Sequence, residues 1–249
     1  MRIKYFERYE LKYLLNREQA RLIQAELLNY LKPDQFGDEV GHYPITSLYY
    51  DTADYQAYWN KIEGHRFRRK VRIRVYGDQV VTPETPVFVE IKQRNNKTLQ
   101  KKRIVVPYQA ALTLCGEGEA IEVETAADQE TMQEVQYLSS VQQLQPACIV
   151  SYNRHALEGS EYDSGLRVTF DTNLKGRIHN LSLLSSDQSE RHYFLPPDWA
   201  IMEVKVNVRV PYWLTELIGK YSCTLRRVSK YCLALEKSKI LLRAQRTLL

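Results

Sequence analysis

Charged and apolar residues alternate along several short segments of the chain. The triplets Glu10-Leu11-Lys12, Glu90-Ile91-Lys92 and Glu203-Val204-Lys205 share one order of acid, apolar residue and base. Because side chains i and i+2 lie on the same face of a β-strand, each triplet places an acid and a base together on one face. The alternation is strongest in residues 70–76, where Lys or Arg occupies every second position up to residue 74. These segments are therefore predicted to be strands with one charged and one apolar face.

The wider pattern predicts a protein that contains both helices and strands. The predicted strands are residues 4–12, 44–50, 67–76, 87–92, 101–106, 147–152, 165–171 and 200–210, with a hairpin turn over 93–100. The predicted helices are residues 16–31, 53–62, 108–114, 126–144, 212–218 and 229–245. Asn16 is an N-cap candidate for the first helix, which residues 32–34 are expected to end. Since no internal repeat, low-complexity tract or linker stands out, we predict a single domain over residues 1–249.

Two features favour a closed sheet with a charged interior. For any single alternating strand, an open sheet with one solvated face is the commoner arrangement. However, Arg68, Lys70, Arg72 and Arg74 stack on one side of a single strand, where like charges repel. The predicted helices are also amphipathic and numerous enough to cover the apolar outer face of a curved sheet. The charged face would then line the interior.

The predicted lining is mainly basic. Its cations are Lys12, Arg72, Arg74, Lys92, Lys101, Arg103, Arg154, Arg167, Lys205, Arg227 and Lys230. Its acids are Glu10, Glu90, Glu203 and Asp171. An excess of buried cations requires an anionic ligand, or bound water and ions. A phosphate chain fits best, because Arg and Lys donors bind phosphoryl oxygens and a remaining carboxylate can hold a divalent metal.

Composition limits the classes of partner and the cellular compartment that we expect for this protein. The chain has 35 Lys plus Arg and 30 Asp plus Glu, a net charge of +5, which is modest for a protein that binds duplex nucleic acid. Its four cysteines form no Cys-x-x-Cys pair, which is typical of free thiols in a reducing compartment. The charged N-terminal residues do not resemble a signal peptide, and no apolar stretch approaches transmembrane length. We therefore predict a cytoplasmic protein that has no specific nucleic-acid partner and could act with a membrane protein.

The same segments carry a resemblance to a known family. The similar motifs are Phe6-Glu7-Arg8-Tyr9-Glu10-Leu11-Lys12-Tyr13, Leu48-Tyr49-Tyr50-Asp51-Thr52, Val71-Arg72-Ile73-Arg74-Val75-Tyr76-Gly77, Val87-Phe88-Val89-Glu90-Ile91-Lys92, Tyr152-Asn153-Arg154, Leu166-Arg167-Val168-Thr169-Phe170-Asp171, Met202-Glu203-Val204-Lys205 and Val228-Ser229-Lys230-Tyr231. They run in the family's order across nearly the whole chain. On these motifs the chain resembles the polyphosphate polymerase domain of the vacuolar transporter chaperone (VTC) family, within the triphosphate tunnel metalloenzymes.

The resemblance implies a fold, an activity and a set of ligands. The implied fold is an α+β protein, an eight-stranded antiparallel β-barrel tunnel with helices packed on the outside. The implied activity transfers the γ-phosphoryl group of ATP to inorganic phosphate or to growing polyphosphate, with Mn²⁺ or Mg²⁺ as the cofactor. By match of motif, the phosphate ligands would be Lys12, Arg72, Arg74, Lys92, Lys101, Arg154, Arg167 and Lys230. The metal ligand would be Glu203.

The full site prediction combines these motifs with the lining. Catalytic roles are predicted for Lys12, Arg72, Arg74, Lys92, Arg167 and Glu203. Further phosphate or nucleotide contacts are predicted for Lys101, Arg103, Arg154, Lys205, Arg227 and Lys230. Glu10 and Glu90 are additional metal candidates, but Glu90 could instead neutralise Lys92 and Arg103 across the hairpin, and Glu10 is similarly open. A product-export membrane protein is the predicted partner beside ATP, phosphate and polyphosphate.

The chain departs from simple tunnel triphosphatases at one position. Those enzymes begin with Glu-x-Glu-x-Lys, whereas this chain has Arg8 at the first acidic position. The missing carboxylate weakens the case for a second metal and for water activation, and it favours transfer to a phosphate acceptor over hydrolysis. Two alternatives remain: a non-catalytic sensor of polyphosphate, inositol phosphates or a nucleotide, and a tunnel triphosphatase or cyclase.

Overall fold

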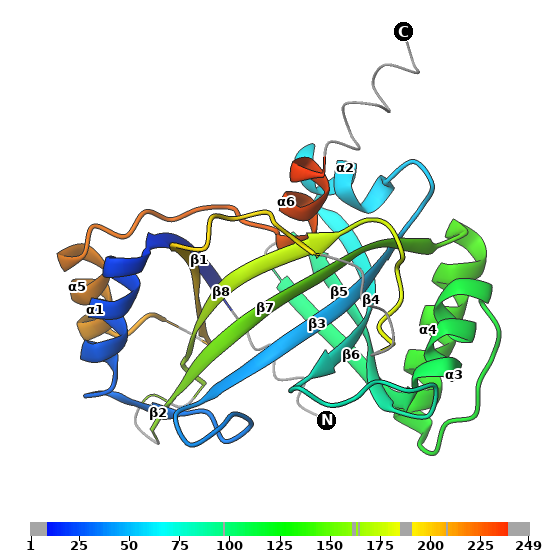
Figure 1. The fold of residues 1–249 in the computed structure, drawn as a ribbon, viewed down its shortest axis with the longest axis horizontal. Helices are drawn as coiled ribbons and strands as arrows, with labels where there is room; N and C mark the ends of the chain where they lie inside the picture. Colours follow the sequence, from blue (N-terminus) through cyan, green and yellow to red (C-terminus); the bar gives the residue numbers. More distant parts are fainter. Residues whose placement is uncertain are drawn as a thin grey trace, which may run out of the picture. The chain divides into compact units, whose positions relative to one another are not determined.

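The sheet is the central feature of the computed structural model, which describes residues 9–96, 98–160, 163, 165–184, 191–207 and 209–238 (Figure 1). Eight strands follow the order β1-β10-β8-β7-β3-β4-β5-β6, while β2 pairs with β7 and β9 with β8. Their bounds are β1 Tyr9–Asn16, β2 Leu31–Pro33, β3 His42–Asp51, β4 Phe67–Tyr76, β5 Pro86–Asn95, β6 Thr98–Pro107, β7 Gln145–Gly159, β8 Arg167–Arg177, β9 His192–Tyr193 and β10 Trp199–Val206. The predicted eight-stranded antiparallel sheet is confirmed.

Helices occupy the connections between these strands. Their bounds are α1 Arg17–Leu27, α2 Gln56–Ile62, α3 Tyr108–Leu112, α4 Ala126–Gln142, α5 Tyr212–Lys220 and α6 Lys230–Lys237, and a π-helical turn, η1 Thr113–Glu117, continues α3. In Figure 1, α1 lies beside α5, and α3 lies beside α4. Within the described ranges, no helix is long and apolar enough to span a membrane.

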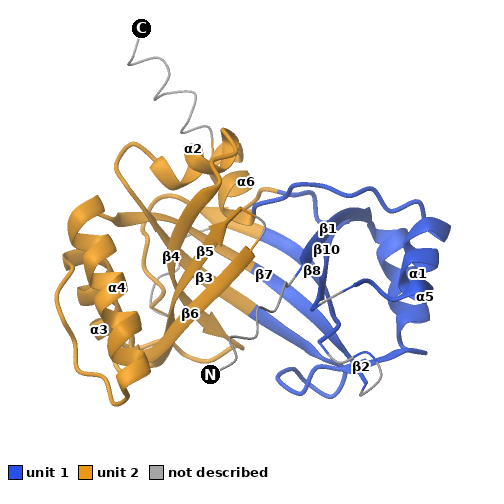
Figure 2. Ribbon diagram, turned by 180° about the vertical axis from the view of Figure 1, so that it is seen from behind, with its two compact units in different colours: residues 1–44, 152–174, 195–229 blue, residues 45–151, 175–194, 230–249 orange. Residues whose placement is uncertain are grey.

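Two compact units divide the chain (Figure 2). Unit 1 comprises residues 1–44, 152–174 and 195–229, and unit 2 comprises residues 45–151, 175–194 and 230–249. Strands β3, β7 and β8 each contribute residues to both units. The prediction of a single domain over residues 1–249 stays a prediction.

The core of unit 1 lies between one face of its strands and helices α1 and α5. Apolar side chains at every second position of β1, β8 and β10 pack against Ile23 and Leu27 of α1 and Leu214 of α5. The start of α1 is fixed by a capping box, because the Asn16 side chain accepts from the Gln19 N–H while the Gln19 side chain accepts from the Asn16 N–H. Burial of the apolar face leaves the alternate residues of these strands on the opposite, polar face.

Unit 2 repeats this arrangement with different helices. Val71, Ile73 and Val75 of β4 belong to a buried cluster that continues through β5 and β6 and includes residues of α3, η1 and α4. The alternate residues of the same strands, among them Arg72 and Arg74, therefore lie on the face turned away from α3 and α4. The predicted packing of helices on the apolar face is confirmed in each unit.

Several element boundaries differ from those predicted. Strand 67–76 is found as predicted, whereas the predicted strand 147–152 is part of the longer β7. The first helix ends at Leu27, four residues before the predicted end, because residues 31–33 pair with β7 as β2. Residues 4–8 of the predicted first strand and 239–245 of the predicted last helix lie outside the described residues.

Asp51 joins three elements of unit 2 at the end of β3. Its buried carboxylate accepts hydrogen bonds from the backbone N–H groups of Thr52 and Ala57, both at 2.8 Å, and of Tyr58 at 3.2 Å. It also accepts a hydrogen bond from the hydroxyl of Tyr231 in α6. One carboxylate thus holds the start of α2 and the start of α6 against the end of β3.

We expect Asp51→Ala to lower the free energy of unfolding by about 3 kcal/mol, because buried donors lose a charged acceptor. The measurement is urea denaturation of the purified protein. Asp54→Ala is the matched control, since Asp54 lies in the same turn and is exposed. A loss for Asp51→Ala no larger than that of the control would contradict this role.

Candidate functional site

The polar face of unit 2 carries cations in register across three strands. Arg72 of β4 lies opposite Glu90 of β5, and Glu90 lies opposite Arg103 of β6. Two residues after Glu90 on the same face of β5, Lys92 lies opposite both Lys70 of β4 and Lys101 of β6. The periodicity of two that the sequence indicated therefore brings these predicted site residues of unit 2 onto one face.

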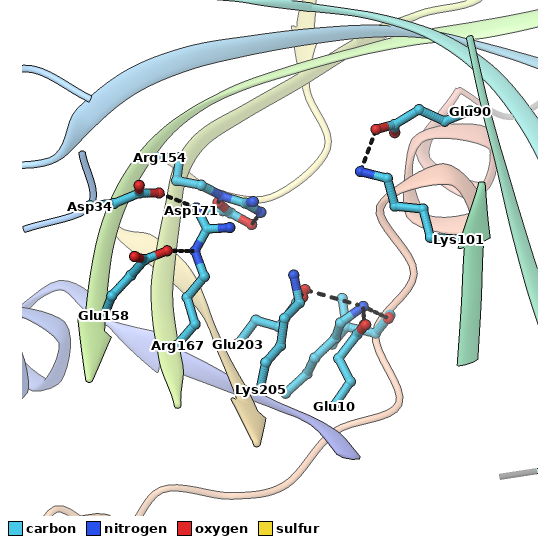
Figure 3. A network of polar contacts seen from close by, with 12 residues as sticks. Glu10, Asp34, Glu90, Lys101, Arg154, Glu158, Arg167, Asp171, Glu203 and Lys205 are labelled. Carbon is cyan, nitrogen blue, oxygen red and sulfur yellow. Dashed lines mark hydrogen bonds and ion pairs between the residues drawn. The ribbon is translucent and has the colours of Figure 1, made fainter. Parts of the chain in front are cut away.

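Glu90 is the acid at the centre of this face. Its fully buried carboxylate accepts from Arg72 Nε at 2.7 Å and lies 2.6 Å from Arg72 Nη2 and 3.8 Å from Arg74 Nη1. It also forms an ion pair with Lys101, which Figure 3 shows. Burial raises the pKa of Glu90, but the charges of Arg72, Arg74 and Lys101 outweigh it and hold that pKa well below its usual range. The carboxylate is therefore ionised, and it fixes the positions of three cations.

This geometry bears on the two roles that the sequence left open for Glu90. The carboxylate forms ion pairs with Arg72, Arg74 and Lys101, as the neutralising role requires, whereas the sequence pattern names Lys92 and Arg103 for that role. Arg103, although opposite Glu90 in register, places its guanidinium over the Phe88 ring, 5.0 Å from the centroid. Register alone could not distinguish a direct cross-strand pair from a diagonal one, because long side chains reach both.

Hydroxyl groups hold the two arginines from the other side. Arg72 Nη1 donates to Tyr49 Oη at 2.9 Å, and Arg74 Nε donates to Ser47 Oγ at 3.0 Å. Tyr49 and Ser47 are the residues of β3 opposite these arginines, so alternation within residues 44–50 was the available signal. Tyr49 belongs to one of the family motifs, but the sequence pattern indicates no role for either hydroxyl.

The pKa of Tyr49 reports the electrostatic balance of this face. Burial raises the pKa of the Tyr49 phenol, but the charges of Arg72, Arg74 and Lys230, together with the hydrogen bond from Arg72, lower it to about 8. Lys230, the first residue of α6, is thus electrostatically coupled to the predicted phosphate-binding residues of unit 2. The field at Tyr49 remains positive although Glu90 is ionised, so this face favours an anion.

Unit 1 carries a second cluster, formed by four alternating charges on β1 and β10. Glu10 lies opposite Lys205, and Lys12 lies opposite Glu203. Lys12 Nζ is 2.8 Å from a Glu10 carboxylate oxygen and 3.6 Å from Glu203, and Lys205 Nζ is 2.8 Å from Glu203 (Figure 3). The Glu-x-Lys triplets of two strands thus form one compact group that is close to electrically neutral.

The side chains of this cluster include oxygen donors that a divalent metal could use. Within the described residues, no group of three His, Cys, Asp or Glu side chains could enclose an ion. Mg²⁺ commonly uses one or two carboxylates together with substrate phosphates, and Glu203 with Glu10 supplies two around one lysine. Thr169, opposite Glu203 on β8, has a buried hydroxyl with no hydrogen-bond partner among the described residues. These donors are all oxygen atoms, and they fit a metal that is also bound by a phosphate ligand.

Two arginines of unit 1, the buried Arg154 and the partly buried Arg167, are held by aspartates. Arg154 of β7 forms a two-pronged pair with Asp171 of β8, with distances of 2.7 and 2.9 Å. Burial lowers the pKa of Arg154, but Asp171 raises it well above its ordinary value. Asp171, predicted among the lining acids, is thus committed to this pair, which positions the guanidinium.

Arg167 has a partner that sequence reasoning missed. Its Nη2 donates to Asp34 and, at 2.8 Å, to Tyr43 Oη, while Nε lies 3.5 Å from Glu158 (Figure 3). Asp34 follows β2 directly and is buried, whereas the sequence pattern places it in the segment that ends the first helix. Its role depends on a contact with a residue far away in the sequence, for which local pattern gives no signal.

The structure says less about two other residues that the sequence analysis names, Arg227 and Arg8. Arg227 is exposed, next to Val228, whose carbonyl oxygen accepts from Lys12 Nζ at 3.4 Å. Arg8, on which the argument against hydrolysis depends, lies outside the described residues. The catalytic, phosphate and metal roles of all these residues stay predictions.

Two proteins of known name are similar to this chain in sequence. Two relatives are subunit 4 of the vacuolar transporter chaperone complex from Trypanosoma brucei brucei, 22% identical, and from Trypanosoma cruzi, 23% identical. Each match covers 91% of this chain but only 34% and 33% of the relatives, so the chain spans about a third of their length.

Solved structures identify the fold, and a family model identifies the family. A putative adenylyl cyclase from Hippeastrum, described as having a dominant triphosphatase activity, matches with a TM-score of 0.54 and 13% identity over 92% of this chain and 96% of its own. A putative adenylate cyclase from Bacillus halodurans matches with a TM-score of 0.50 and 14% identity over 88% and 92%. These two neighbours share the fold, and the predicted class, an antiparallel eight-stranded sheet with helices packed on it, is confirmed. Because the model of the VTC domain matches residues 7–239, the chain belongs to the VTC domain family.

Proposed function

We propose that this domain transfers the γ-phosphoryl group of ATP to inorganic phosphate or to a growing polyphosphate chain, with Mn²⁺ or Mg²⁺ as the cofactor. The observation that carries the proposal is the polar face of unit 2, where Arg72, Arg74 and Lys101 surround one buried carboxylate and the field remains positive. Membership of the VTC family supports it. Phosphoryl transfer requires mainly positioning and charge stabilisation, which fixed cations supply.

Unit 2 would bind the phosphate chain. Glu90 and Tyr49 hold Arg72 from two sides, and Glu90 and Ser47 hold Arg74, so both guanidinium groups are oriented before a ligand arrives. A preorganised donor loses less conformational entropy on binding than a mobile one. Lys92, Lys101 and Lys230 would add charge along the same chain of phosphates, and Arg103 would contact the nucleotide.

Unit 1 would supply the metal ligands and further cations. Glu203, with Glu10, would hold the ion, and the Thr169 hydroxyl could bond to a metal-bound water or a phosphoryl oxygen. A bound divalent ion would neutralise charge that develops on the transferring phosphoryl oxygens. Lys12, Lys205, Arg154 and Arg167 would neutralise the remaining phosphate charge. The attacking phosphate oxygen is already anionic, so no side chain is needed as a general base, and we assign none.

The partners are also part of the proposal. The relatives are subunits of a chaperone complex and are about three times as long as this chain. We therefore propose that the domain acts next to a membrane protein that exports the product, and that the reaction takes place in the cytoplasm.

Two other functions are tested by the same experiment. A triphosphatase is suggested by the activity attributed to the Hippeastrum protein, and a non-catalytic sensor would use the same cations without turnover. Purified protein is incubated with ATP and Mn²⁺, and products are followed by gel electrophoresis and ³¹P spectroscopy. ADP with a phosphate polymer supports the polymerase, ADP with phosphate alone indicates a hydrolase, and binding without turnover indicates a sensor.

Glu203→Gln should reduce turnover at least about 100-fold, because the amide is a poor metal ligand and removes one charge from the metal site. The measurement is the rate of ADP release with saturating Mn²⁺. Binding of tripolyphosphate without metal should persist, which separates a metal role from misfolding. Near-normal turnover in this variant would remove the proposed metal site.

Arg72→Ala should weaken tripolyphosphate binding by about 10- to 100-fold, the effect of losing a charged hydrogen bond. Isothermal titration calorimetry provides the dissociation constant. The matched control is Arg69→Ala, since Arg69 lies on the same strand but on the opposite face, 3.9 Å from Glu134 of α4. Equal losses for the two variants would mean that net charge, and not this face, governs binding.

Tripolyphosphate affinity should fall as pH rises above about 8, the pKa of Tyr49. The sign follows from competition, because tyrosinate neutralises the cations that a phosphate needs, whereas bound phosphate favours the protonated phenol. Above that pKa the affinity should fall with rising pH by at most about tenfold per pH unit, the limit for a single titrating group. Tyr49→Phe should remove this part of the pH dependence, and an unchanged profile in Tyr49→Phe would refute the assignment.

A further inference from the structure

An aromatic row borders the cations on the polar face of unit 2. Phe88 of β5 lies opposite Arg74 of β4 and Val105 of β6, and Tyr76 follows on the same face of β4. The Phe88 and Tyr76 rings contact each other edge to face, with centroids 5.2 Å apart. Phe88 is only half-buried, although its neighbours Val87 and Val89 lie in the core.

This row is continuous with the predicted phosphate-binding residues. Phe88 lies two residues from Glu90 on the same strand, which places the two rows about 7 Å apart. Arg74 contacts both rows, because its Nη1 lies 3.8 Å from Glu90 and donates to Tyr76 Oη at 3.4 Å. Next to the Phe88 ring are the Arg103 guanidinium, 5.0 Å from its centroid, and Val105, which is 55% exposed.

A polar face that ends in half-exposed aromatic and apolar side chains matches an amphipathic ligand. Inorganic polyphosphate carries no apolar group and gains nothing from Phe88 or Val105. A nucleoside triphosphate has a flat base at one end and phosphates at the other. Aromatic rings and arginine guanidinium planes are the side chains on which bases commonly stack.

We propose that Phe88, Tyr76 and Arg103 form a subsite for the base of a nucleoside triphosphate whose phosphates bind the adjoining cations. This inference rests on the proposed function, since it names which end of that substrate lies at the aromatic row. Stacking uses the π-face common to all bases, so the subsite favours nucleotides over inorganic tripolyphosphate and discriminates weakly among bases. The aromatic row thus distinguishes a nucleotide donor from a polyphosphate chain.

The test compares two ligands in three proteins. Calorimetry measures the dissociation constants of the β,γ-imido analogue of ATP and of inorganic tripolyphosphate for the wild type, Phe88→Leu and Phe67→Leu. Phe67 is a matched control, because it also lies 5.0 Å from a guanidinium, that of Arg69, but on the other face of β4. Phe88→Leu should weaken the nucleotide analogue by about tenfold and leave tripolyphosphate unchanged. Phe67→Leu should change neither.

Each other outcome has a defined meaning. Equal effects of Phe88→Leu on both ligands, or no effect, overturn the base subsite while tripolyphosphate binding still supports the proposed function. If the wild type binds neither ligand, the proposed function fails and the subsite with it. Should Phe88→Leu not fold, Phe88→Trp keeps an aromatic ring and supplies a fluorescent probe. Its emission should change with the nucleotide analogue and not with tripolyphosphate, and the same response to both contradicts the proposal.

Discussion

The buried carboxylate of Glu90 is the constraint on which the polar face of unit 2 depends. It carries its negative charge among Arg72, Arg74 and Lys101, and breaking such a buried ionic group typically costs about 3–5 kcal/mol. Without this acid, the like charges of neighbouring strands would repel each other at close range. Glu90 therefore allows several cationic side chains to lie close together on this face. Because these cations outnumber Glu90, the face still favours an anion.

The same principle appears in unit 1 with a different balance. Glu10 and Glu203 alternate with Lys12 and Lys205 across two strands, and Asp171 and Asp34 hold Arg154 and Arg167. In unit 1 the negative charges of the acids nearly balance the positive charges of the bases. Such a balance suits oxygen ligation of a metal better than binding of a phosphate chain alone. The two units thus differ in the charge balance of strands that share one pattern, apolar on one face and charged on the other.

The sequence predicted what depends on short-range periodicity. The strand 67–76, the Asn16 cap and the charged faces follow from alternation and capping rules that act within a few residues. Alternation does not predict the contacts of Asp34 with Arg167, of Asp51 with Tyr231 of α6, or of Tyr49 with Arg72, because each joins residues of separate elements of the chain. Alternation leaves two roles open for Glu90, because it identifies the face on which a side chain lies and not the side chain that it contacts there.

The central claim is that cations fixed by Glu90 on unit 2 bind a phosphate chain. The most direct test is a crystal structure of the protein with tripolyphosphate. The account predicts phosphoryl oxygens within hydrogen-bond distance of Arg72 and Arg74, with the carboxylate of Glu90 still paired to Arg72. Tripolyphosphate bound elsewhere on the protein, with this face of β4 and β5 unliganded, would contradict it.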